Sequence, residues 1–114
     1  MIRCYFLIPL LLLFSFASHG QTLEEYFEEL PRQFSPEGNG VNDTWGKYIN
    51  DVEKVNFKIY SRWGTLIFEG DNNTTWNGYT LSGDPCPQGV YIYIFNIVKN
   101  GETKIFKGTV EIIK

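Results

Sequence analysis

Residues 90–98 read Val-Tyr-Ile-Tyr-Ile-Phe-Asn-Ile-Val, a run made almost entirely of aromatic and β-branched side chains. These residue types favour extended backbone, and the length of the run suits a single strand. Aromatic side chains alternate on one face and aliphatic ones on the other. The two sets are Tyr91, Tyr93 and Phe95, and Ile92, Ile94 and Val98. Because both faces are apolar, the run predicts a strand in the middle of a sheet.

A hairpin is predicted on each side of this strand. Before it, residues 55–59 alternate between apolar and polar side chains, and a turn at 61–64 leads into a returning strand at 65–69. After it, Asn100-Gly101 is a strong hairpin signal, and 103–114 form the final strand.

Turn-rich segments at 76–78 and 81–85 add two candidate edge strands. The chain then offers about six or seven short strands, with no room for parallel crossovers. We therefore predict an all-β fold, in the form of a small antiparallel β-sandwich.

The first twenty residues predict a cleaved secretory signal peptide. Arg3 supplies a positive charge, Cys4 to Phe16 form an apolar run, and small residues allow a cut after Gly20. A single membrane anchor is the alternative, although the apolar run is short for a span. After cleavage Cys86 would be the remaining cysteine, so an internal disulfide is excluded and stability must come from packing.

Residues 21–32 predict a short lead-in helix. Thr22 and Glu25 fit a capping box, and Pro31 would end the helix. The apolar positions fall on one helical stripe: Leu23, Tyr26, Phe27 and Leu30. A loosely ordered lead-in is the alternative. The main domain would then span residues 33–114.

The run Phe34-Ser-Pro-Glu-Gly-Asn-Gly-Val-Asn-Asp43 predicts a sharply folded loop. Pro36 fixes its own φ, while Gly38 and Gly40 can adopt positive φ. The loop also carries oxygen-bearing side chains, namely Glu37, Asn39, Asn42 and Asp43. These could ligate calcium, or they could hydrogen-bond the backbone of a purely structural loop.

Several spaced motifs occur in a fixed order along the chain. They are Phe34-Ser35-Pro36-Glu-Gly38-Asn-Gly40, Ile59-Tyr-Ser-Arg62-Trp63-Gly64, Trp76-Asn-Gly78, Pro87-Gln-Gly89-Val-Tyr91-Ile-Tyr93, and Phe106-Lys-Gly108. In this order they resemble the gliding motility-associated C-terminal domain, also called the type B sorting domain of type IX secretion. The resemblance covers residues 33–114.

The resemblance implies an immunoglobulin-like β-sandwich with a non-catalytic sorting role. The domain would be recognised by the type IX outer-membrane translocon after Sec export, with a PorP/SprF-type outer-membrane protein as a further partner. The expected location is the cell surface, the outer membrane or the medium. In the family this domain ends a long protein, so the short segment 21–32 in place of a cargo domain is a departure.

Other interpretations of the motif residues remain open. Trp63, Trp76, Tyr91 and Tyr93 could form a glycan-stacking platform, as in a stand-alone adhesion or carbohydrate-binding module, although core packing is favoured. Arg62 could pair with Asp43 or Glu69. Cys86 is expected to be a buried small hydrophobe and not a reactive thiol.

Composition excludes several classes of function. The single histidine, His19, lies in the leader, so a Ser-His-Asp or Cys-His site is excluded after cleavage. No phosphate-binding glycine motif is present. The net charge is −3 and the lysines are scattered, which argues against nucleic acid. We therefore expect no catalytic site, no small-molecule substrate and no cofactor other than calcium.

Overall fold

The computed structural model describes residues 22–37 and 43–114. The predicted signal peptide lies outside the described residues, and so do Gly38, Asn39, Gly40 and Asn42. Within the described part of the chain, no helix is long and apolar enough to cross a membrane.

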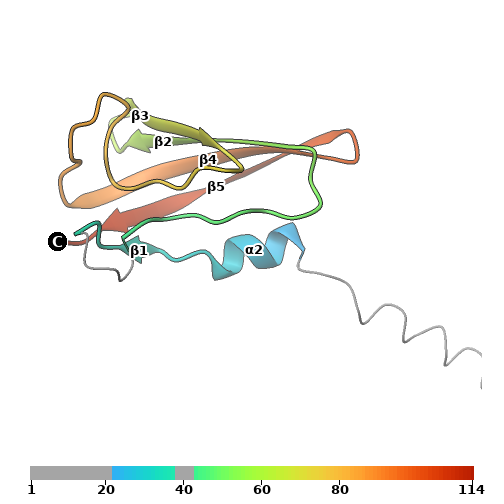
Figure 1. The fold of residues 1–114 in the computed structure, drawn as a ribbon, viewed down its shortest axis with the longest axis horizontal. Coiled ribbons are helices and arrows are strands. Elements are labelled where there is room, and N and C mark those ends of the chain that lie inside the picture. The colour runs from blue at the N-terminus through green and yellow to red at the C-terminus, as the bar shows by residue number, and fades with distance from the viewer. Residues whose placement is uncertain (1–21, 38–42) are drawn as a thin grey trace, which may run out of the picture.

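One five-stranded sheet organises the fold (Figure 1). Its strands are β1 (Gln33–Phe34), β2 (Lys54–Ser61), β3 (Leu66–Asp71), β4 (Gly89–Lys99) and β5 (Glu102–Ile112). Their spatial order is β1-β5-β4-β2-β3. β4 is the middle strand, which confirms the position predicted from its two apolar faces. The all-β class is also confirmed.

The details of the sheet differ from the predicted antiparallel sandwich of six or seven strands. The described residues form five strands in a single sheet, and β1 pairs with β5 in parallel. Residues 76–85 contribute isolated bridges, Trp45 with Trp76 and Tyr79 with Pro85, because glycine, proline and polar residues interrupt any longer ladder. The parallel pair needs no local crossover, because β1 and β5 are separated in the sequence by nearly the whole domain.

Strand alternation places the core on one face of the sheet. The buried strand residues are Phe34, Val55, Phe57, Ile59, Tyr91, Tyr93, Phe95, Ile97, Val110 and Ile112. Three non-strand segments cover this face: α2 (Leu23–Glu29), residues 43–53 and residues 72–88. Their aromatic rings interlock with those of β4, with Trp45 5.0 Å from Tyr93 and Trp76 5.4 Å from Tyr91 between ring centroids. These segments form the layer that a second sheet would form in a sandwich.

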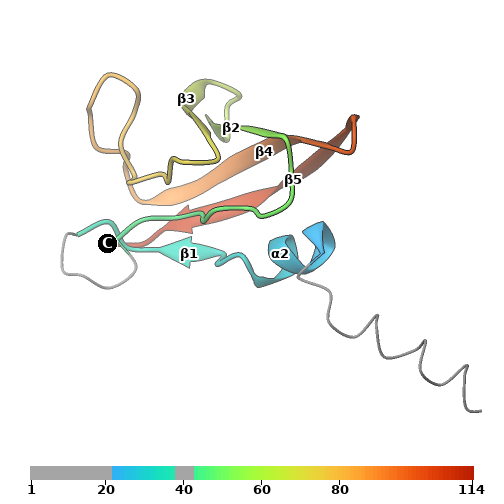
Figure 2. The same cartoon turned by 45° about the vertical axis from the view of Figure 1, so that its right-hand side comes forward.

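The predicted helix is present and packs on the sheet, alongside β5 in both views (Figure 1, Figure 2). Thr22 and Glu25 form the reciprocal capping box, with Glu25 N donating to Thr22 Oγ1 at 3.1 Å. Tyr26 is buried, and Phe27 stacks on Phe106 of β5 at 4.4 Å between ring centroids. The helix is short, so packing supplies most of its stability.

Candidate functional site

Three of the four candidate platform aromatics belong to the core. Trp76 is fully buried, and Tyr91 and Tyr93 are 6% and 9% exposed. Trp76 also packs against Phe34, with the ring centroids 5.3 Å apart. Core packing is therefore confirmed for these three residues, and none of them offers a free aromatic face to a sugar.

Trp63 is the exception, because 82% of its surface is exposed. The prediction that Trp63 fills the core is therefore wrong. The residue follows the end of β2, in the turn that leads to β3. Alternation no longer decides the direction of a side chain once the ladder has ended, and Gly64 turns the chain back with a φ of +90°.

The turn that carries Trp63 is held by a dense set of hydrogen bonds. Ser61 Oγ accepts from the backbone N–H groups of Trp63 and Thr65, both at 3.2 Å. Ser61 N donates to Thr65 O at 2.8 Å, and Gly64 N donates to Ser61 O at 2.9 Å. Trp63 is thus presented on a well-defined backbone.

Arg62 lies over this exposed ring. Its Cζ atom is 5.2 Å from the centroid of the Trp63 ring, which is a cation–π distance. Glu69, one of the two carboxylates predicted to pair with Arg62, accepts a hydrogen bond from Asn56 Nδ2 at 2.9 Å. The described contact of Arg62 is therefore with its neighbour Trp63, and the two side chains form one cationic aromatic unit.

A cavity of about 270 Å³ lies next to this unit. Its walls come from the turn, from residues 86–91 at the start of β4, and from Ile67 and Thr80. The backbone of Leu81 donates to Ile67 O at 3.0 Å and holds the loop that contains Thr80 against β3. The cavity and Trp63 therefore belong to the same end of the sheet.

Cys86 lines this cavity but is only 1% exposed, which confirms that it is buried. Burial raises the pKa of its thiol above the ordinary value. The thiol is thus held in its less nucleophilic, protonated form. Burial likewise raises the pKa of the neighbouring Tyr91 hydroxyl, which donates to Pro87 O at 2.7 Å.

The described ends of the loop at 34–43 are anchored in the core. Phe34 is buried, and Pro36 packs so closely on Gly78 that a Cβ there would lie 2.7 Å from Pro36 Cγ. Glu37 and Asp43 line a shallow cavity with Thr44, Asn77 and Tyr79. The other two proposed calcium ligands lie outside the described residues. No group of three acidic, cysteine or histidine side chains that could hold a metal occurs in residues 22–37 and 43–114.

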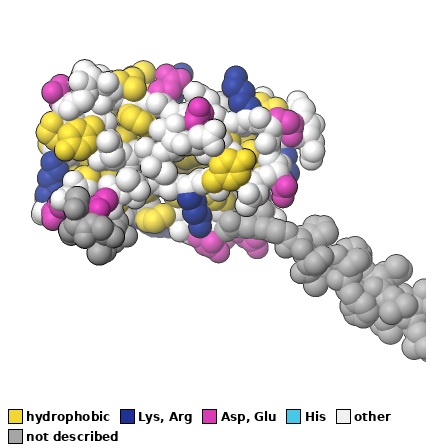
Figure 3. Space-filling view, viewed as in Figure 1, with side chains coloured by type: hydrophobic (Ala, Val, Ile, Leu, Met, Phe, Trp, Pro, Cys, Tyr) yellow, Lys and Arg dark blue, Asp and Glu magenta, His cyan; other side chains and the backbone are white. Residues whose placement is uncertain are grey.

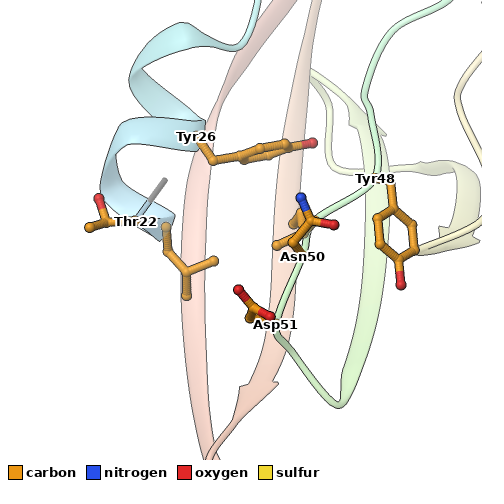
Figure 4. A pocket seen from close by; sticks show the side chains of 7 residues that line it. Thr22, Tyr26, Tyr48, Asn50 and Asp51 are labelled. Atoms are coloured by element: carbon orange, nitrogen blue, oxygen red, sulfur yellow. The ribbon is translucent and has the colours of Figure 1, made fainter. Parts of the chain in front are cut away.

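A second cavity, of about 260 Å³, lies between α2 and residues 48–51 (Figure 4). Tyr26 points from the helix toward this segment, and its hydroxyl donates to Lys47 O at 2.8 Å. Burial raises the pKa of Tyr26. Asp51 adopts a φ of +63°, a conformation that the sequence did not signal. We interpret this cavity as part of the packing interface between α2 and residues 48–51 and not as a ligand site, because the buried hydroxyl of Tyr26 already donates to the backbone.

Together, the fold and the exposed turn define a small all-β domain with an aromatic side chain on its surface. The family model "CHU_C Type IX secretion signal domain" matches residues 28–112, and the chain therefore belongs to this family. The match runs from the last turn of α2 to the end of β5 and confirms the resemblance. Neither the curated proteins nor the solved structures gave a match.

Membership in this family defines the general role of the chain. The domain is a sorting signal of type IX secretion, which implies contact with the secretion machinery and export to the cell surface or outer membrane. Secretion signal domains of this family are not catalytic.

Proposed function

We propose that the folded domain, acting as a unit, is read by the type IX outer-membrane translocon after the chain has crossed the inner membrane. This proposal rests on one observation: the family match extends over nearly the whole folded domain. Residues 28–112 include the end of α2, the complete sheet and the other two segments that cover its core face, 43–53 and 72–88. A signal of this extent acts through its surface and not as a short linear peptide.

Two finer features complete the proposal. The apolar leader at residues 1–20 directs the chain into the Sec pathway and is removed after Gly20. A PorP/SprF-type outer-membrane protein then receives the domain, as in the gliding motility-associated branch. The domain contributes binding and the machinery contributes transport, so the chain itself carries out no chemistry.

An export assay tests this function. A fluorescent reporter is inserted between Gly20 and Gln21, so that the leader and the domain keep their order. In a host with an active type IX system, we expect the reporter at the cell surface or in the medium. Disabling the translocon, or removing residues 28–112, should leave it in the periplasm.

The processing step is measured on the chain without a reporter, exported from the same host. Mass spectrometry of the exported chain should give Gln21 at the N-terminus of the reporter-free protein, whereas an intact Met1 on a membrane-bound species would contradict the leader. Equal surface delivery with and without residues 28–112 would reject the sorting role.

A further inference from the structure

We propose that the domain docks on its secretion partner through one end of the sheet, by inserting Trp63 into an apolar, acidic-rimmed socket of a protein of the machinery. We call this end the Trp63 surface and define it as Arg62, Trp63, Leu66, Leu81 and Val90. The inference rests on the proposed sorting function and adds to it the site and the chemistry of the partner.

Exposed apolar side chains gather on this surface. Trp63, Leu66, Leu81 and Val90 are 82%, 42%, 60% and 43% exposed. Trp63 and Val90 line the same cavity, and Leu81 is hydrogen-bonded to the backbone of Ile67, the residue after Leu66. Hydrophobic side chains also gather at this end of the molecule in the space-filling view (left in Figure 3). Several exposed apolar side chains at one end of a small domain are typical of an interaction surface.

Trp63 has the properties of an anchoring residue. Large aromatic and arginine side chains dominate binding energy at protein interfaces, above all at the centre of the patch. The hydrogen bonds of Ser61 fix the turn before any partner arrives, so binding does not have to order the backbone. The adjacent cavity of about 270 Å³ lets a partner side chain enter beside the indole ring.

The charge of the surface indicates what the partner presents. Arg62 is the one charged residue among those lining the cavity, although the chain as a whole has a net charge of −3. A partner that is complementary here therefore places a carboxylate near the guanidinium, while an acidic surface would be repelled elsewhere on the domain.

A protein partner fits these side chains better than a saccharide does. Sugar sites pair a flat aromatic face with available hydrogen-bonding groups. The polar side chains beside Trp63 are those of Ser61, Thr80 and Gln88, and each already accepts a hydrogen bond from the backbone of the domain. Arg62 already lies over one face of the indole and leaves less of it free for stacking. A protein partner, in contrast, can cover the exposed side chains of Leu66, Leu81 and Val90 with apolar side chains of its own, which is favourable because apolar surface leaves water.

The test uses the reporter chain described above with point substitutions. Trp63→Ala and Arg62→Glu should each lower the exported fraction about tenfold or more, while Trp63→Phe should retain part of it. Tyr48→Ala is the matched control, because Tyr48 is an aromatic residue of similar accessibility, 58% exposed, at the opposite end of the sheet. Its export should equal that of the unsubstituted chain.

Two further measurements distinguish the outcomes. Thermal unfolding of each chain, purified from the periplasm of a translocon-deficient host, should show that Trp63→Ala remains folded. If deletion of residues 28–112 blocks export but folded Trp63→Ala is exported normally, the docking surface is wrong and the sorting function stands. Normal export of Trp63→Ala, combined with lost binding to surface polysaccharide from the host, would assign the surface to a saccharide and overturn the proposal.

Discussion

Trp63 and Trp76 place the same side chain in opposite environments, one 82% exposed and one fully buried. Trp76→Ala should lower the free energy of unfolding by about 3–5 kcal/mol, because it leaves a large cavity between Phe34 and Tyr91. Trp63→Ala should cost less than about 1 kcal/mol, mainly through its contact with Arg62. Urea unfolding of both variants measures the difference. Similar losses would contradict the assignment of one tryptophan to the core and one to the surface.

Gly108 is a residue whose missing side chain matters. A Cβ at this position would overlap the hydroxyl group and Cζ of Tyr93, whose ring is fixed between Trp45 and Phe95. Gly108→Ala should therefore lower the free energy of unfolding by about 1–3 kcal/mol through overpacking. In a Tyr93→Ala background the same substitution should cost almost nothing, and a double-mutant cycle by urea unfolding measures this coupling. A cycle that shows no coupling would contradict the steric explanation.

At the residue scale, the sequence predicts burial well where a strand ladder continues and poorly where it ends. The alternation of β4 correctly separates Tyr91, Tyr93 and Phe95 from the other face. The direction of Trp63 depends instead on the turn that Ser61 and Gly64 build after the last pair of β2. No periodic pattern encodes that geometry, so the exposed tryptophan could not be predicted.

At the scale of elements, Glu53, which directly precedes β2, holds the turn of the β4–β5 hairpin through hydrogen bonds, an arrangement that we call the Glu53 clamp. Its carboxylate accepts from the backbone N–H groups of Asn100 at 3.1 Å and Gly101 at 3.0 Å. The bond from Gly101, followed by that from Asn100, lowers the pKa of Glu53 below its ordinary value of 4.5. The clamp therefore stabilises the folded state above the unfolded pKa and is lost as the pH falls through the lower, folded-state pKa.

This clamp predicts a pH-dependent effect of Glu53→Gln. The melting temperature of the variant should lie below that of the unsubstituted chain at pH 7, and the gap should close as the pH falls below 4.5. Thermal unfolding between pH 7 and pH 2 measures it. Glu102→Gln removes the same charge from the same hairpin and controls for net charge. A gap that is constant over this range would contradict the role of the ionised carboxylate.

At the element scale, the signals that proved reliable have a local physical basis. The capping box of Thr22 and Glu25 satisfies its backbone groups locally, and Asn100 and Gly101 both adopt the positive φ that a tight hairpin turn requires. Residues 72–88 could not be assigned in this way. Their bridges depend on partners such as Trp45, which lies 31 residues before Trp76 and is brought close only by the finished core.

For the molecule as a whole, calcium binding by Glu37, Asn39, Asn42 and Asp43 remains a prediction. A bound ion stabilises the folded state by RT ln(1 + [L]/Kd), about 2.7 kcal/mol at a hundredfold excess over Kd. Chelator should then lower the melting temperature of the calcium-loaded chain, and Asp43→Ala should abolish that difference. A melting curve that is indifferent to chelator would leave the loop as a structural turn.

The topology of the whole sheet was only partly predictable. The β-class follows from local patterns, but the number of strands was overestimated, and the parallel pairing of β1 with β5 joins Phe34 to Ile112. Such a contact spans nearly the whole domain and leaves no periodic trace in either segment. Two residues of β1 are also too few for any strand signal.

The position of β5 between β1 and β4 has a consequence for the timing of export. The sheet acquires its β1 edge only when residues 111–112 are available for pairing, so a nascent or broken chain lacks the finished surface. Contacts over such long separations also form slowly, so we expect the pairing of β1 with β5 to be a late step of folding. If the translocon reads the folded domain, as we propose above, a chain that stops short of its last strand should fail to be exported.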